Sequence, residues 1–251
     1  ISDVAYLSFS NSAGTLAQSG QGDDAKSNLS LLSENIETRN SGFKNVVITD
    51  TSGNIVYEYD DVQGMKESFF GFEEIEDLPE GNVKISNIYM NNEDYGTDVF
   101  FVAKSIDKDG LNIKDGYAIE VIDLSRLTEI LSHSTYGEGK GYLTVSDSNG
   151  CVLNYNGTTV QKIDDISDSG MCDIYRSMIK PVKKDENIDY NAGSSLGCYN
   201  YFSGPTTAGW KWVSVYPGNM SMSQIMVPVA ISVGSMALLA IICALLGILI
   251  T

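Results

Sequence analysis

The feature that most restricts the fold of this chain is an apolar run near its C-terminal end. Residues Ile225 to Ile250 form a stretch of 26 positions without a charged side chain. As a helix that rises about 1.5 Å per residue, the run would reach about 39 Å, enough to cross a hydrocarbon core of about 30 Å with some tilt. A buried core helix is the alternative, but such helices are usually uncharged over only about 10 to 14 residues. The run therefore predicts a membrane-spanning helix, with lipid around residues 225–250.

The charged residues all precede this run, and their balance is strongly acidic. The chain has 33 Asp and Glu against 16 Lys and Arg, which gives a formal net charge of -17. Nucleic-acid binding depends on clustered basic residues that neutralise phosphates, and the sequence contains no such cluster. The chain also has a single histidine, His133, and no C-x-x-C spacing, which argues against a zinc site. We therefore expect neither a nucleic-acid partner nor a cofactor.

The four cysteines leave the redox state open. Cys243 lies inside the apolar run, where it cannot pair with the other three without leaving the membrane. A disulfide between two of Cys151, Cys172 and Cys198 is one interpretation if this part of the chain faces an oxidising space. Three free buried thiols are the other.

An internal repeat organises the residues before the apolar run. Two β-rich runs within residues 43–59 flank the turn segment Asp50–Gly53, and two more within residues 141–156 flank Asp147–Gly150, which lies 97 positions later. Both are typical of hairpins. A second pair of strand segments, 100–123 and 198–217, repeats in the same order. The two matches at nearly equal spacing indicate a duplication.

Helical signals surround the repeated strands. Residues 1–40 contain Leu29, Leu32 and Ile36 at helical spacing and predict a long N-terminal helix, interrupted near Gly20 and Gly22. A second apolar stripe follows Asp123, which we expect to be its N-cap, and predicts a helix over 124–131. The combination predicts an α+β protein with two antiparallel sheets. Trp210, Trp212 and Tyr216 could mark a membrane interface, but the repeat favours placing them in a strand.

This arrangement resembles the double Cache domain, the PAS-like extracytoplasmic sensor region of bacterial transmembrane receptors. The residues that carry the resemblance are the two turn segments, the stretch Gly116–Leu131 and the last strand Gly209–Pro217. The resemblance implies four parts: an N-terminal helical segment (1–41), a membrane-distal Cache module (42–126), a linking helix with a membrane-proximal Cache module (127–220), and a transmembrane helix (221–251). It further implies a homodimer along the N-terminal helices.

The resemblance also implies a small-molecule ligand in the distal module. Members of the family that bind amino acids use a set of Tyr, Arg, Trp and Asp, but the distal module here has no Trp, and its only Arg is Arg126. A mostly apolar pocket with one carboxylate would suit a ligand with an amine or several hydroxyls. Filling of the core is the alternative role for each aromatic residue. The predicted ligand-binding residues are Phe69, Phe70, Tyr89, Tyr95, Asp98, Phe101 and Tyr117.

The expected function is ligand sensing by a bacterial membrane signalling receptor, with residues 1–220 outside the cytoplasm. No phosphate-binding loop or dinucleotide fingerprint occurs, and adjacent acids such as Glu73 and Glu74 are interpreted as solvated charge, so we expect no enzyme in this region. A membrane-anchored surface or adhesion module is the main alternative, and an anchored hydrolase ranks third. The ligand's identity, the module that binds it and the output domain are open at this stage.

Overall fold

The computed structural model describes residues 2–60, 66–107, 114–133, 135–136, 141–155, 158–166, 194–196, 199–205 and 209–217. Within these residues no helix combines the length and the apolar character that a membrane crossing requires. The apolar run Ile225–Ile250 lies outside them, and so do Cys172 and Cys198. Cys151 is described, and it is a buried free thiol.

The first sheet has six antiparallel strands among the described residues. Their order is β2-β1-β6-β5-β3, and β4 pairs with β5. The central strands contain continuous apolar runs because both of their faces are covered. Val46 and Ile48 of β1 face one core, whereas Val47 faces the other. The strands are β1 (Phe43–Asp50), β2 (Ile55–Glu58), β3 (Val83–Ile85), β4 (Tyr89–Asn92), β5 (Thr97–Asp107) and β6 (Lys114–Asp123).

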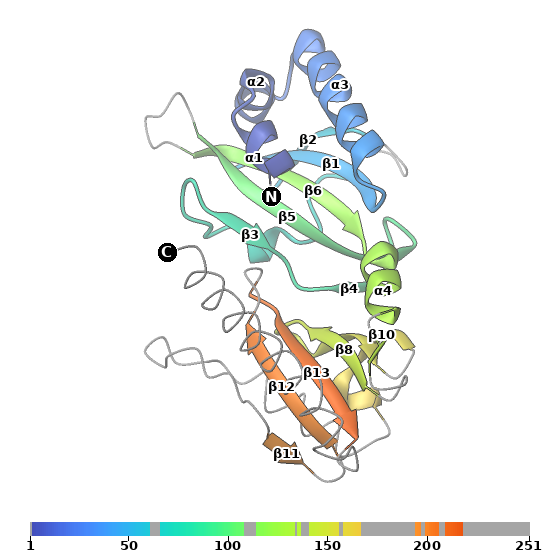
Figure 1. The fold of residues 1–251 in the computed structure, drawn as a ribbon. Helices are drawn as coiled ribbons and strands as arrows, with labels where there is room; N and C mark the ends of the chain where they lie inside the picture. The colour runs from blue at the N-terminus through green and yellow to red at the C-terminus, as the bar shows by residue number, and fades with distance from the viewer. Residues whose placement is uncertain are drawn as a thin grey trace, which may run out of the picture.

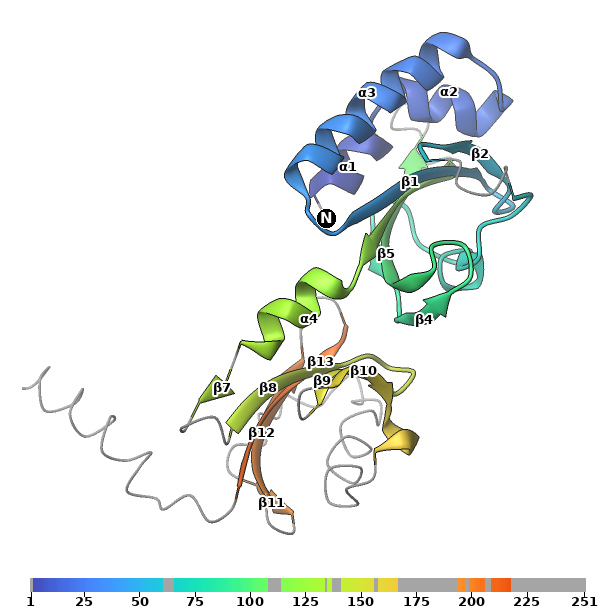
Figure 2. The same ribbon diagram turned by 90° about the vertical axis from the view of Figure 1, so that its right-hand side faces the viewer.

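Three helices, α1 (Ser2–Ser8), α2 (Asn11–Ser19) and α3 (Asp23–Arg39), cover one face of this sheet (Figures 1 and 2). The sequence predicted one long N-terminal helix with an interruption near Gly20 and Gly22, and the structure instead divides this segment into three helices. Ser10 ends α1 and caps α2, because its Oγ accepts the Ala13 N–H at 3.4 Å. Gly20 then takes the left-handed conformation (φ 64°) and ends α2. This second break lies where the glycines predicted an interruption.

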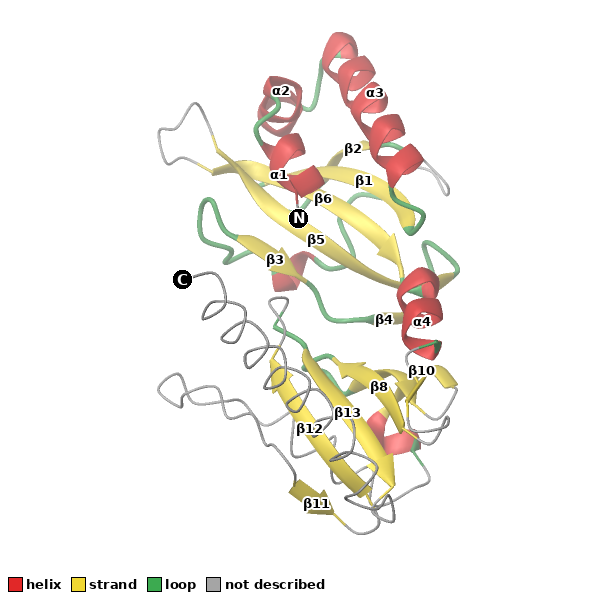
Figure 3. Cartoon of the chain, in the orientation of Figure 1, coloured by secondary structure: helices red, strands yellow, loops and turns green. Residues whose placement is uncertain are grey.

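The second sheet has seven antiparallel strands among the described residues, in the order β10-β9-β8-β13-β12-β11, with β7 paired to β8 (Figures 2 and 3). Helix α4 (Ser125–Ser132) leads from β6 into it, and the short 3-10 turn η2 (Ile163–Asp165) follows β10. The strands are β7 (Thr135–Tyr136), β8 (Gly141–Ser146), β9 (Cys151–Tyr155), β10 (Thr158–Lys162), β11 (Ser194–Leu196), β12 (Tyr199–Pro205) and β13 (Lys211–Pro217).

The two sheets repeat one topology. The order β2-β1-β6-β5-β3 of the first sheet corresponds to β9-β8-β13-β12-β11 in the second. The two repeated turns also share their hydrogen bonds. Asp50 Oδ1 accepts the N–H groups two and four positions later at 2.8 and 2.9 Å, and Asp147 Oδ1 does the same at 3.0 and 2.8 Å. Gly53 (φ 84°) and Gly150 (φ 85°) close these turns. The structure thus agrees with the predicted duplication, while the exact domain boundaries stay a prediction.

The two sheets meet at an apolar junction that contains Trp210. Its indole ring is buried and contacts the Phe100 ring edge-on, with the centroids 5.2 Å apart. Leu124 and Leu131 from the α4 region belong to the same cluster. Trp210 directly precedes β13 and Trp212 lies within it, which agrees with their assignment to the sheet. Leu124, not Asp123, is the N-cap residue of α4, although an Asp123 carboxylate oxygen still accepts the Ser125 N–H at 2.6 Å.

Candidate ligand-binding site

An aromatic cluster lies on the face of the first sheet that the helices leave free. Its floor is formed by inward-facing residues of β1, β5 and β6, and its cover by residues 69–78, Tyr89 and Tyr95. Figure 2 shows β4 and its neighbouring loops on this side of the sheet, opposite α1–α3. We call the following residues the aromatic cluster: Phe69, Phe70, Phe72, Tyr89, Tyr95, Phe101 and Tyr117.

The segment that covers the cluster is attached to its surroundings near its start. The Phe69 N–H donates to the Gly53 carbonyl at 3.0 Å, which ties the segment to the β1–β2 turn. Near the start of the segment, the Lys66 ammonium pairs with Asp94 in the β4–β5 turn. Gly71 passes so close to the sheet that a Cβ there would lie 2.2 Å from Phe101 Cε1. A glycine is therefore needed at this close approach.

The rings pack edge to face over most of the cluster. Phe70 is central, with its centroid 4.8 Å from Tyr89, 5.9 Å from Phe101 and 6.1 Å from Tyr95. Edge-to-face pairs place the positive edge of one ring on the negative face of another, which adds to the stabilisation from burial. The negative face of such a ring attracts a cation as well as the edge of another ring.

Glu74 lies at one side of the cluster, in the short 3-10 turn η1 (Phe72–Glu74). Its carboxylate accepts a hydrogen bond from the Tyr89 hydroxyl at 2.9 Å, from the Asn87 N–H at 3.1 Å and from Asn87 Nδ2 at 3.3 Å. The Lys84 ammonium is 3.9 Å away. Burial, followed by the bond to Glu74, raises the pKa of Tyr89, so this phenol stays protonated and donates.

A second polar group borders the cluster at Tyr95. The Asn45 side-chain amide donates to the Tyr95 hydroxyl at 3.4 Å and to Glu58 Oε1 at 2.7 Å. Burial raises the pKa of Tyr95, and the negative charges of Glu58 and Asp60 raise it further, while the Asn45 bond lowers it. Carboxylates therefore flank the cluster on two sides, and the electrostatic potential there favours positive charge.

Tyr117 contributes its ring to the cluster, but its hydroxyl is already engaged. It donates to the Glu76 carbonyl at 2.7 Å and accepts from the Lys114 ammonium at 2.5 Å. The Tyr117 ring packs edge-on against Phe72, with the centroids 5.8 Å apart. This tyrosine holds the cover to the sheet.

Six of the seven predicted site residues thus come together, and Asp98 does not. Val99 and Phe101 of β5 face the cluster, so the alternation of a strand places the Asp98 side chain on the opposite face. Its carboxylate accepts the Asn91 N–H at 2.7 Å. Its charge acts instead on the Cys151 thiol at the junction of the two sheets. Burial raises the pKa of this thiol to about 11, and the negative charges of Asp147 and Asp98 contribute to the increase.

The carboxylate that does reach the cluster is Glu74, which the sequence interpretation missed. Its position beside Glu73 in an acidic stretch suggested solvated charge. The local spacing gives no signal for Glu74. The 3-10 period of three brings Phe72 and Ile75 to one side of the turn, and Glu74 is recognised only through its contacts with Asn87 and Tyr89.

No protein-family model matches the sequence, and no curated protein matches it. Solved structures do match. A domain of a protein assigned to the sensory box/GGDEF family of Vibrio parahaemolyticus has a TM-score of 0.56 at 14% identity, over 88% of both chains. The extracellular domain of a protein assigned as a histidine kinase has a TM-score of 0.54 at 13% identity, over 90% of this chain and 85% of that one.

The ligand-binding domain of the Pseudomonas fluorescens chemoreceptor CtaA, in complex with L-alanine, has a TM-score of 0.52 at 12% identity, over 87% of this chain and 90% of that one. The chain shares the fold of these domains. At these identities the likeness concerns the fold alone and leaves the ligand to be argued from the residues.

Proposed function

We propose that this chain is the ligand-sensing region of a membrane signalling receptor and that its aromatic cluster binds a small molecule with an amine. The Glu74–Tyr89 hydrogen bond beside the edge-to-face rings is the observation that carries the proposal. An ammonium group would gain a charge-assisted hydrogen bond from Glu74 and cation–π attraction from the rings. The Cache-type fold, shared with extracellular and chemoreceptor domains, supports a sensory role.

The ligand we propose lacks an α-carboxylate. Arg126 of the distal module follows β6 at the start of α4, remote from the covering segment in the sequence. The ammonium of Lys84 is the cation beside Glu74, and it lies 3.9 Å from that carboxylate. Two further lysines near the cluster already have partners, since Lys114 contacts Tyr117 and Lys66 pairs with Asp94. The Glu74 carboxylate beside the rings therefore favours a simple amine over an amino acid.

The rest of the receptor architecture is also part of the proposal. Residues 1–220 would lie outside the cytoplasmic membrane, and the apolar run would carry the change across it. Exposed apolar side chains on α1, the α1–α2 connection and α3 support a homodimer through the helix layer: Tyr6 is 66% exposed, Phe9 75% and Leu31 59%. A ligand changes such an assembly only if it binds one arrangement more tightly than the other.

Thermal unfolding of the whole chain in detergent, with four matched small molecules, tests the ligand class. Butylammonium should raise the melting temperature by mass action, whereas 1-butanol, butyrate and L-alanine should raise it less. Glu74→Gln should weaken butylammonium binding by about tenfold or more, since a bond to a charged group contributes about 1.5–3 kcal/mol.

Glu73→Gln is the matched control, because it makes the same charge change one position away on an exposed side chain. Its butylammonium shift should equal that of the wild type. Absence of any shift with amines would refute the ligand class. An equal loss in both variants would point to net charge and not to the site.

A further inference from the structure

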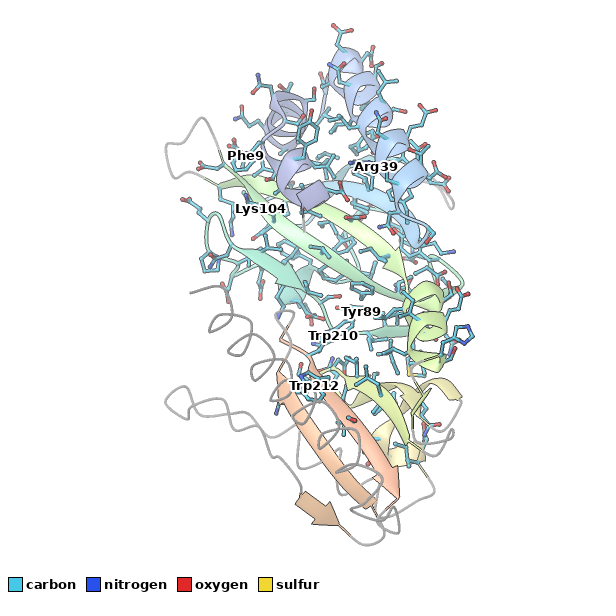
Figure 4. All side chains as sticks on the ribbon, in the orientation of Figure 1. Phe9, Arg39, Tyr89, Lys104, Trp210 and Trp212 are labelled. Atoms are coloured by element: carbon cyan, nitrogen blue, oxygen red, sulfur yellow. The ribbon has the colours of Figure 1, made fainter. Side chains whose placement is uncertain are left out.

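The segment Ser86–Ile88, which connects β3 to β4, contacts both sheets through each of its residues. Ser86 pairs with Phe101 through its N–H and Oγ, both at 2.9 Å, and its carbonyl accepts the Trp210 indole N–H at 3.0 Å. The Ile88 N–H donates to Asp147 Oδ2 at 2.8 Å. Figure 4 shows Tyr89 and Trp210 close to this junction of the two sheets.

Asn87 joins the two sheets through a single side-chain amide. Its Nδ2 donates to the Glu74 carboxylate at 3.3 Å, and its Oδ1 accepts from Ser148 Oγ at 2.5 Å and from the Ser148 N–H at 3.2 Å. A rotated amide would place its oxygen against the carboxylate and its NH₂ against the Ser148 N–H, both of which are repulsive. Glu74 on one side and Ser148 on the other therefore fix one orientation of this amide.

We infer that Asn87 is the link by which occupancy of the aromatic cluster is passed to the Asp147–Cys151 turn of the second sheet. This inference deepens the proposed function and rests on it for the identity of the ligand. The Glu74 carboxylate holds Asn87 and the Tyr89 hydroxyl at once. An ammonium group that binds Glu74 competes with Asn87 for the same oxygens, so the amide is released and its bonds to Ser148 weaken.

The coupling is reciprocal, because linkage requires that the second sheet affect the ligand as the ligand affects the second sheet. Ser148 holds Asn87 in the position from which it competes with the ligand. Removing the Ser148 hydroxyl should therefore make Asn87 a weaker competitor and tighten the binding of an amine. Ser148 is an exposed turn residue of the second sheet, 61 positions away from Asn87 in the chain.

Hydrogen exchange of the whole chain in detergent tests the link without any ligand. Peptides that cover 147–151 should exchange at least threefold faster in Glu74→Ala than in the wild type, and at the wild-type rate in Glu73→Ala. Unchanged exchange of this turn in Glu74→Ala would overturn the inference. If β6 peptides also lose protection, Glu74→Leu replaces the alanine variant, because it keeps the bulk of the side chain but has no acceptor for Asn87, and the same comparison decides.

Butylammonium affinity in Ser148 variants tests the coupling from the other direction. Ser148→Ala should bind butylammonium at least threefold more tightly than the wild type, and Ser148→Thr, which keeps a hydroxyl, should restore the wild-type affinity. Equal affinities in all three would overturn the coupling and leave the ligand proposal intact. If the wild type does not bind butylammonium, the ligand proposal fails, and the exchange experiment alone decides whether Asn87 links the sheets.

Discussion

At the scale of single residues, the most exceptional group outside the site is the carboxylate of Glu120. It lies in the middle of β6 beneath the helix layer and is 1% exposed. Asn40, which ends α3, donates to it at 2.8 Å. Burial raises the pKa of Glu120; the Asn40 bond lowers it, Asp3 raises it and Arg39 lowers it. The folded state therefore disfavours the ionised form, despite the hydrogen bond.

Glu120→Gln should accordingly stabilise the fold at neutral pH. A carboxyl whose pKa is raised on folding lowers stability above the folded pKa, and this penalty disappears as the pH falls through the folded pKa toward the ordinary value. The difference in melting temperature between variant and wild type should be largest near pH 7 and shrink toward pH 4. The exposed Glu34→Gln on α3 provides the control and should show no such trend. A stability difference that does not change with pH would contradict the assignment.

At the scale of elements, two glycines show opposite packing demands. Gly14 lies inside α2, and the nearest atom to a Cβ there is Ile106 Cγ2 at 4.0 Å. Gly116 lies in β6, and a Cβ there would be 2.0 Å from the Thr49 carbonyl oxygen of β1. The first position has room for a methyl group, whereas the second has backbone in that place.

Gly14→Ala should therefore raise the free energy of unfolding by about 0.5–1 kcal/mol, because it removes backbone freedom from the unfolded chain. Gly116→Ala should lower it by about 1–3 kcal/mol, since β1 and β6 must move apart. Urea unfolding at constant protein concentration measures both. A Gly116→Ala variant that is as stable as the wild type would show that β1 and β6 have room for a methyl group between them.

The elements also show how far sequence reasoning reaches. The hairpins β1–β2 and β8–β9 were predictable, because each carries its own turn chemistry in Asp50–Gly53 and Asp147–Gly150. The short strands β3 and β11 have no such local signal, since pairing with β5 and β12 defines them. In the predicted long N-terminal helix, the interruption near Gly20 and Gly22 was anticipated, whereas the break between α1 and α2 was missed because Ser10 was not recognised as a cap.

The candidate site divides in the same way. The aromatic residues were predictable as a group, because side chains along β5 and β6 point alternately to the two faces of the sheet and the covering segment is rich in Phe. Asp98 was wrongly grouped with Phe101. The two residues are three positions apart in one strand, so the alternation of side chains places them on opposite faces of the sheet. Glu74 and Asn87 act through contacts between elements, and no local pattern of residues encodes such contacts.

At the scale of the whole molecule, the junction determines whether the two sheets behave as one unit. Trp210 is 6% exposed there, donates its indole N–H to Ser86 and packs on Phe100. The junction also contains Ile88, Leu124 and Cys151. Because these apolar side chains are buried between the two sheets, we expect the sheets to unfold cooperatively.

Trp210→Ala should remove that cooperativity. Loss of a buried Trp usually costs about 3–5 kcal/mol, and here the cost falls on contacts between the sheets more than within either one. Calorimetry of the whole chain in detergent should then show two separate transitions in place of one. Trp212→Ala, two positions further along and only partly buried, is the control and should lower the melting temperature without splitting the transition. A single transition in Trp210→Ala would mean that the remaining connections, through α4 and through Asn87 and Ile88, are enough to couple the two modules.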